Sequence, residues 1–258
     1  MDFALTDEHR MVQEMVKGFG QKEVAPIIKE YDRKQEMADF ILPRMGELGI
    51  LGICLPVRYG GQGMDYISLG LACEELEAVD STLRVVMSVH IGLNSLALLQ
   101  WGTEEQKEKF LVPQSRGEKI ACFGLTEPGA GSDVAAMTST AKKTASGYVI
   151  NGEKMWISLA TKADHALVVA RTDPDASDPH DGLSAFMVEI ERPGVSTGDI
   201  HGKLGVRAGS TGWIAFQNVE IASRGIIIRH YWVAIYTYGN GGVPTNIACR
   251  VYGCCIVP

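Results

Sequence analysis

The sequence lacks the features that mark several classes of protein. Its N-terminus has no basic segment leading into an apolar stretch, and it is too acidic for a transit peptide. No apolar run reaches the ~18 residues that a membrane span needs. The formal net charge of -7 disfavours nucleic acid or an anionic membrane as the main partner. We therefore expect a cytoplasmic protein that binds neither.

Cysteine is also scarce, with six in 258 residues, which is too few for a disulfide scaffold. The spacing of the cysteines fits no usual zinc pattern and there is no HExxH segment, so we predict no metal site. Hydrophobic residues make up 46% and charged residues 21% of the chain, which is typical of a folded globular protein.

Residues 1–118 carry the pattern of a helical domain. Thr6 is placed to cap a helix, and Thr103 with Gln106 forms the spacing of a capping box. Apolar residues recur at helical spacing in five segments, each with one mainly apolar face. We predict a bundle of helices at about residues 6–25, 38–48, 67–79, 82–100 and 103–111.

Residues 119–221 change to short alternating or apolar runs separated by turn signals, among them Asn151-Gly152. Strands are expected at 120–126, 138–144, 148–150, 154–159, 166–171, 183–191 and 213–219. This spacing predicts an antiparallel β-barrel or sandwich, so the fold class is α+β.

Residues 222–258 differ from both preceding parts. From Ile221 to the end there is no Asp or Glu, although the first 220 residues contain all 31. No clean helical or strand period is visible, so we assign no domain here and expect poor packing and aggregation.

The most informative stretch runs from Cys122 through Thr126, Gly129 and Gly131 to Asp133. It indicates a strand that enters a Pro-Gly turn and a glycine-rich loop, whose backbone N–H groups could cradle a phosphate. A third glycine is missing, so this is not a dinucleotide-binding fingerprint, and no Gly-Lys-Ser/Thr follows. On local grounds an ordinary connecting loop remains an alternative.

Two segments together resemble the acyl-CoA dehydrogenase family. Residues 124–136, GLTEPGAGSDVAA, are similar to its signature, and residues 154–158, KMWIS, are similar to its second flavin segment. Residues 56–63, 102–110, 203–212 and 216–220 add further matches in the right order. The resemblance covers about residues 1–221 and implies an N-terminal helical bundle, a middle β domain and a C-terminal four-helix bundle.

The resemblance implies FAD as cofactor and assigns roles to particular residues. Thr126 would hydrogen-bond the flavin ring, Trp156 would cover one ring face, and Ser158 would bond near N5 or O4. Ser132 would lie near the pyrophosphate and the acyl-CoA substrate. The cofactor-binding set is Phe123, Gly124, Leu125, Thr126, Glu127, Pro128, Gly129, Ala130, Gly131, Ser132, Trp156, Ile157 and Ser158.

The reaction implied by the family is α,β-dehydrogenation of an acyl-CoA thioester, with an electron-transferring flavoprotein as the usual electron acceptor. A carboxylate takes the α-proton while the β-hydrogen moves as hydride to the flavin. Members of the family are homo-oligomers.

The sequence departs from the family after Ile221. The family's base is a Glu of the C-terminal four-helix bundle, which we expect to be absent here, so no catalytic residue is assigned. We expect the chain alone to be inactive and to retain FAD weakly. The alternatives are a non-catalytic flavin- or CoA-binding remnant, and an acyl-CoA oxidase or flavin monooxygenase on the same fold.

Arg84 is a candidate for substrate recognition. Residues 80–90, DSTLRVVMSVH, are similar to the matching stretch of glutaryl-CoA dehydrogenases, in which an arginine here pairs with the free carboxylate of a dicarboxylic acyl chain. A guanidinium offers a carboxylate a planar two-point contact. The alternative is that Arg84 extends to the surface of an ordinary helix.

Overall fold

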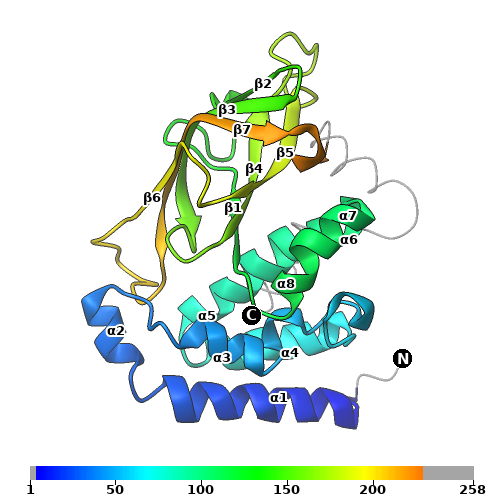
Figure 1. The fold of residues 1–258 in the computed structure, drawn as a ribbon. Coiled ribbons are helices and arrows are strands. Elements are labelled where there is room, and N and C mark those ends of the chain that lie inside the picture. The colour runs from blue at the N-terminus through cyan, green and yellow to red at the C-terminus, as the bar shows by residue number, and fades with distance from the viewer. Residues whose placement is uncertain (1–3, 229–258) are drawn as a thin grey trace.

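A computed structural model describes residues 4–228 as a helical domain followed by a sheet domain (Figure 1). In the list that follows, η marks a 3₁₀ or π helix. The helical elements are α1 (Asp7–Phe19), η1 (Gly20–Val24), α2 (Ile28–Lys34), α3 (Ile41–Glu47), η2 (Ile50–Gly52), η3 (Val57–Tyr59), α4 (Tyr66–Glu77), α5 (Ser81–Val86), η4 (Met87–Ser95), α6 (Leu96–Trp101), α7 (Glu104–Gln106), η5 (Lys107–Leu111) and α8 (Val112–Ser115).

The chain changes from helix to strand between α8 and the first strand. The elements that follow are β1 (Ala121–Gly124), η6 (Val134–Ala136), β2 (Thr140–Lys143), β3 (Gly147–Ser158), β4 (His165–Arg171), β5 (Leu183–Glu189), β6 (Val195–Asp199), β7 (Thr211–Ala222), η7 (Ser223–Gly225) and β8 (Ile226–Ile228). The predicted domain boundaries, at 118/119 and 221/222, stay predictions. Residues 229–258 of the predicted tail lie outside the part of the chain that the structure describes.

The strands form one mainly antiparallel sheet, in the order β6-β7-β3-β2-β4-β5-β8. Only the pairings of β1 and β2 with β4 are parallel among the described strands. The path runs from β6 to β8 without closing on itself within residues 4–228. The predicted α+β fold class, a helical bundle followed by an antiparallel β domain, is confirmed, but the described strands form an open sheet and not the closed barrel that was one of the two predicted forms.

The two predicted helix caps are present because their side chains satisfy backbone N–H groups that a helix end leaves unpaired. Thr6 accepts a hydrogen bond from the His9 backbone, and the His9 side chain accepts one from Thr6 N–H. Thr103 and Gln106 form the predicted capping box at α7. Each cap therefore fixes where its helix begins.

Three local predictions were wrong or incomplete. Asn151-Gly152 is not a hairpin turn, because β3 runs through it with a bulge between Ile150 and Gly152. Gly152 has φ +141°, and a Cβ there would lie 2.3 Å from Ser139 Oγ, so only glycine fits. The helix α2 follows Pro26 where no helix was expected, and β6 was missed because half-exposed residues give it no clean alternation.

One helix contradicts the prediction that no apolar segment is long enough to span a membrane. The continuous helix Ser81–Trp101, made of α5, η4 and α6, has a mean hydropathy of 1.4 over an 18-residue window, long and apolar enough to cross a membrane. However, 72% of that window is buried inside the fold. Its hydropathy is that of a core helix of the helical domain.

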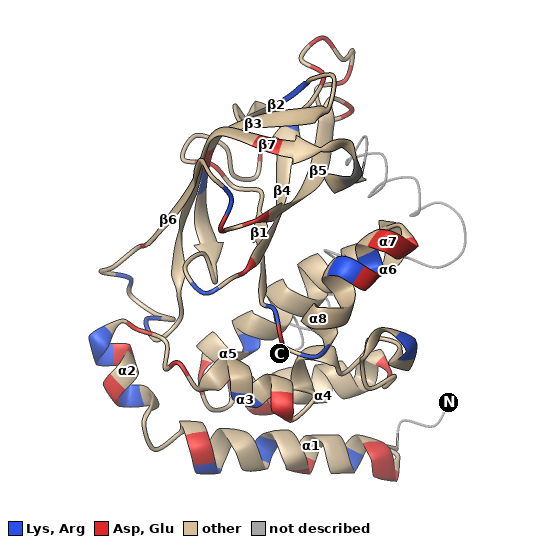
Figure 2. Ribbon diagram, viewed as in Figure 1, with Lys and Arg blue, Asp and Glu red and all other residues tan. Residues whose placement is uncertain are grey.

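Polar contacts join the helical domain to the sheet domain. Lys162 Nζ lies 2.7 Å from Asp39 Oδ1, and Lys109 Nζ lies 2.7 Å from Glu189 Oε1. Deeper in the junction, the ring of His90 is fully buried between the Gln114 carbonyl and the Ala121 N–H group. Figure 2 shows positive and negative residues interspersed over both domains, so the junction does not depend on a single-sign face.

Acid should weaken the fold through His90. Burial lowers the pKa of His90 to about 4, with the nearby His165 acting in the same direction and with the Gln114 carbonyl and Asp164 acting against it. An unfolded histidine titrates near ~6.5, so the unfolded chain binds the extra proton and stability is lost as pH falls from 6.5 towards 4. We expect His90 to lower the free energy of unfolding by about 2 kcal/mol between pH 7 and pH 5.

Urea unfolding at the two pH values measures this loss. His90→Asn removes the imidazole but keeps His165, whose pKa burial also lowers, so the variant should lose less stability over the same range. An equal loss in both proteins would show that His90 is not the group responsible.

Candidate functional site

The glycine-rich loop leaves β1 at Gly124 and is closed by its own backbone. Glu127 N–H donates to Ala130 O at 2.9 Å, and Ala130 N–H donates back to Glu127 O at 3.2 Å. This pair of bonds forces a tight turn at Pro128-Gly129, and the following residues 131–133 are exposed. The loop therefore exposes its glycine backbone to solvent, while the two hydrogen bonds between Glu127 and Ala130 fix its conformation.

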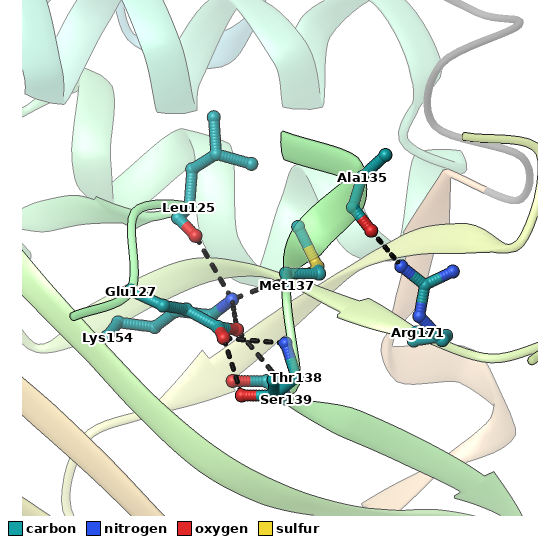
Figure 3. A network of polar contacts seen from close by, with 8 residues as sticks. All are labelled: Leu125, Glu127, Ala135, Met137, Thr138, Ser139, Lys154 and Arg171. Carbon is teal, nitrogen blue, oxygen red and sulfur yellow. Dashed lines mark hydrogen bonds and ion pairs between the residues drawn. The ribbon is translucent and has the colours of Figure 1, made fainter. Parts of the chain in front are cut away.

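A buried ion pair holds this loop against β3 (Figure 3). Lys154 Nζ lies 2.7 Å from Glu127 Oε1 and donates to Leu125 O at 3.1 Å. The Lys154 side chain is fully buried and that of Glu127 is 3% exposed. Because one ammonium contacts the loop at both residues 125 and 127, the loop cannot move away from β3 without leaving a buried charge unpaired.

The carboxylate of Glu127 accepts further hydrogen bonds from two residues besides Lys154. Its Oε2 accepts hydrogen bonds from the backbone and the hydroxyl of Thr138, and its Oε1 accepts one from Ser139 N–H. Burial alone would raise the pKa of Glu127, but the hydrogen bonds from Lys154 and Ser139 and the lysine's charge outweigh it and lower the pKa to about 2. Glu127 is therefore a permanent carboxylate that organises the loop and cannot serve as a proton acceptor near neutral pH.

Backbone contacts extend the same junction. Met155 N–H donates to Thr126 O at 2.8 Å, so two predicted flavin segments are joined by a main-chain bond as well as by the ion pair. Gly124 makes room for the lysine, because a Cβ there would lie 3.3 Å from Lys154 Cγ. The far end of the loop is tied down by Arg171, whose guanidinium donates to Ala135 O at 2.5 Å and to Pro179 O at 3.0 Å.

Trp156 is turned out of the sheet. It has φ +60°, lies at a register shift of β3 against β7, and is 56% exposed. A left-handed backbone at a bulky residue costs free energy, and a bulge is a common way to re-aim a side chain beside a functional site. The fold therefore holds a large flat indole in solvent, two residues from the buried Lys154.

The predicted cofactor residues divide into three groups by burial. Glu127, Ala130 and Ile157 have buried side chains, so they support the loop and strand from inside. The exposed members are Pro128, Gly129, Gly131, Ser132 and Trp156. Phe123, Leu125, Thr126 and Ser158 are half-buried, and Gly124 is buried. Their individual roles stay predictions.

Arg84 occupies a different environment in the helical domain. Its Nε lies 2.8 Å from Glu77 Oε2, its Nη1 donates to Ser88 Oγ at 3.1 Å, and its side chain is 26% exposed. Arg84 is half-buried on the surface of this helix, and both its role in substrate recognition and the alternative of an ordinary surface arginine stay predictions. Its charge already has a carboxylate partner within this chain.

Sequence reasoning missed Lys154 and Arg171 as supporting residues. Lys154 is the first residue of the predicted strand 154–159 and directly follows Glu153, so the sequence is typical of a solvated strand end, whereas a buried lysine needs a carboxylate partner. Glu127 was the available acid in the adjoining motif. Across residues 4–228 no three His, Cys, Asp or Glu side chains cluster in a way that could hold a metal ion.

The chain matches two models of one protein family, in line with its helical domain, its antiparallel sheet domain and its glycine-rich loop beside Trp156. Residues 6–118 match the acyl-CoA dehydrogenase N-terminal domain, and residues 122–219 match the acyl-CoA dehydrogenase middle domain. The chain belongs to the acyl-CoA dehydrogenase family.

Known relatives agree with these matches. The chain is 40% identical, over 98% of its length, to a short-chain specific acyl-CoA dehydrogenase of Clostridium acetobutylicum, of which it spans 66%. It matches a chain in a structure of the electron transferring flavoprotein of Acidaminococcus fermentans with a TM-score of 0.86 and 35% identity, over 97% of this chain and 63% of that one. A glutaryl-CoA dehydrogenase from Mycobacterium smegmatis, in complex with FADH2, matches with a TM-score of 0.83 and 32% identity, over 96% and 60% of the two chains.

Breaking the buried pair from one side should destabilise the sheet domain strongly. Glu127→Gln leaves a buried ammonium without its carboxylate, which typically costs ~3–5 kcal/mol. Lys154→Met should cost less, because Thr138 and Ser139 still donate to the carboxylate. In the double variant we expect a coupling free energy of at least ~1 kcal/mol, measured by urea unfolding of all four proteins.

Glu30→Gln provides the control, because Glu30 pairs with Lys34 in an exposed position and its loss should leave stability close to that of the wild type. Strictly additive losses for Glu127→Gln and Lys154→Met would contradict a coupled buried pair.

Proposed function

We propose that residues 4–228 bind FAD and form the flavin-binding part of an enzyme that introduces an α,β double bond into a short-chain acyl-CoA. One observation carries the proposal: the Glu127–Lys154 pair fixes an exposed glycine-rich loop beside an exposed, out-turned Trp156. The relatives support the chemistry, since one is named for short-chain acyl-CoA and another was solved with FADH2.

The residues present fit a flavin dinucleotide. A Cβ built on Gly129 or on Gly131 would meet no heavy atom within 4 Å, so the loop backbone is open to a ligand. Exposed N–H groups of such a loop suit a pyrophosphate, and an exposed indole suits a flat ring. When bound, FAD supplies the two-electron acceptor for the substrate's β-hydrogen. Trp156 would cover the ring, and Thr126 and Ser158 would offer it hydrogen bonds.

The substrate side of the proposal rests on Ser132 and on the helical domain. Ser132 is exposed beside the glycines, where it can donate to a phosphate or to the pantetheine of acyl-CoA. The base that removes the α-proton is proposed to lie outside this loop, because Glu127 already accepts from Lys154, Thr138 and Ser139. The family resemblance assigns that base to a C-terminal helical domain.

An electron transferring flavoprotein is the proposed electron acceptor, supported by the A. fermentans structure that matches this fold. Two alternatives make different predictions. An acyl-CoA oxidase or monooxygenase would pass electrons to oxygen, whereas a non-catalytic remnant would bind FAD or CoA without reducing the flavin. Both tests use a protein that joins residues 1–221 to the C-terminal part of the C. acetobutylicum relative, which supplies the base. Hydrogen peroxide formation by this protein separates an oxidase from a dehydrogenase, and anaerobic bleaching of its flavin by butyryl-CoA excludes a remnant that cannot reduce flavin.

Trp156→Ala should weaken FAD binding by about tenfold, because the indole provides the stacking surface. Titration of the chain with FAD, followed by flavin fluorescence, measures the affinity. Tyr66→Ala is the matched control, since Tyr66 is an exposed aromatic at the start of α4. If both substitutions have the same effect, Trp156 is an ordinary surface residue.

The 258-residue chain alone should show negligible acyl-CoA dehydrogenase activity. Residues 221–258 contain no Asp or Glu, and loss of a positioned base typically costs ~10²–10⁴-fold in rate. Reduction of an artificial dye with butyryl-CoA by the purified chain, reconstituted with FAD, measures this. Robust dye reduction would place the base within the chain.

A dicarboxylic acyl-CoA is a second candidate substrate, favoured by the similarity of residues 80–90 to glutaryl-CoA dehydrogenases and by the glutaryl-CoA dehydrogenase match. The test needs an active protein, made by joining residues 1–221 to the C-terminal part of the C. acetobutylicum relative. Arg84→Ala should lower kcat/KM for glutaryl-CoA more than for butyryl-CoA if Arg84 binds the free carboxylate. An unchanged ratio would leave Arg84 as the structural partner of Glu77.

A further inference from the structure

The helical domain inserts two polar side chains into the junction with β1. His90 and Asn94 lie about one turn apart on the π helix η4, and both are fully buried. Burying such groups costs free energy unless each finds a hydrogen-bond partner. Leu or Met would fill the same space without that cost, so the hydrogen bonds of His90 and Asn94 are what distinguishes them from apolar residues.

His90 contacts two backbone groups of other elements. Its Nε2 lies 3.0 Å from Gln114 O, and because a carbonyl only accepts, Nε2 must carry the hydrogen. Its Nδ1 is then an acceptor, and Ala121 N–H donates to it at 3.0 Å. The Gln114 carbonyl thereby selects the tautomer of His90 that can hold the first residue of β1.

Asn94 contacts the next residue along the same strand. Its Nδ2 donates to Cys122 O at 2.9 Å, while its Oδ1 has no hydrogen-bond partner among the described residues. An amide that is only half satisfied contributes little net stability, and an apolar residue of similar shape can replace it at small cost. What Asn94 supplies is the position of the Cys122 carbonyl.

These contacts lie directly before the proposed flavin loop. Cys122 is followed by Phe123 and Gly124, and Leu125 O then accepts the hydrogen bond from Lys154. The start of the loop is therefore held from the helical domain by η4 and from the sheet domain by Lys154. π-helical turns are rare and are frequent at functional sites.

We propose that His90 and Asn94 are positioning residues that hold β1 so that the loop from Phe123 to Ser132 is ready to bind FAD. This proposal rests on the proposed function. It also couples the helical domain, which carries Arg84 in the same continuous helix, to the flavin loop.

Two substitutions at His90 separate positioning from packing. His90→Asn keeps an acceptor at the place of Nδ1 for Ala121 N–H, whereas His90→Gln keeps a donor near Nε2 for Gln114 and loses that acceptor. Asn94→Leu removes the bond to Cys122 O, and Gln100→Ala is an exposed control in α6 of the same helix. FAD affinity of the full chain is measured by fluorescence, with urea unfolding of each variant alongside.

We expect His90→Gln and Asn94→Leu to raise the FAD dissociation constant by about tenfold, the equivalent of one lost hydrogen bond. His90→Asn and Gln100→Ala should stay within about twofold of the wild type, and Asn94→Leu should unfold at nearly the wild-type urea concentration. If His90→Asn is as weak as His90→Gln, or if neither His90→Gln nor Asn94→Leu weakens binding, the positioning role is wrong.

Amide hydrogen exchange of the chain without FAD distinguishes this failure from a failure of the proposed function. If the wild type binds no FAD, the cofactor assignment fails, but the hold of His90 and Asn94 on β1 is still tested by exchange at residues 121–130. Faster exchange there in His90→Gln and Asn94→Leu than in Gln100→Ala supports this positioning role. Equal exchange in all four proteins overturns it.

Discussion

The ion pair between Lys154 and Glu127 is the constraint on which the site depends. A fully buried ammonium tolerates no alternative to its carboxylate, so residues 125–127 and β3 must come together in the folded chain. The hydrogen bonds that Thr138 and Ser139 donate then fix the orientation of the carboxylate. Because residues 125–127 are immobilised, the glycine-rich loop can expose backbone N–H groups without collapsing onto the sheet.

The same arrangement explains the backbone cost at Trp156. A left-handed φ at a tryptophan is unfavourable in isolation, but the strand is anchored at Lys154 on one side and continues to Ile157, which is 2% exposed, on the other. The bulge between these anchors leaves the indole no place in the core. Packing of the neighbours therefore offsets the local strain and keeps a stacking surface available.

Much of the fold followed from local sequence signals, because helix caps and apolar periodicity act within a few residues. The capping box at Thr103 and Gln106 is an example. Asn151-Gly152 was misjudged because its turn signal is overridden by tertiary contact: β7 pairs with both sides of it, and Asn218 N–H donates to Asn151 Oδ1. The role of Lys154 was not predicted, since a pair 27 residues apart is set by the topology of the sheet.

Hydrogen–deuterium exchange of the chain with and without FAD reports on both locked segments at once. We expect FAD to slow exchange together in residues 123–133 and 154–158, with α1 and α4 unaffected. Protection in only one of these segments, or protection confined to the helical domain, would contradict a flavin site built on the Glu127–Lys154 pair.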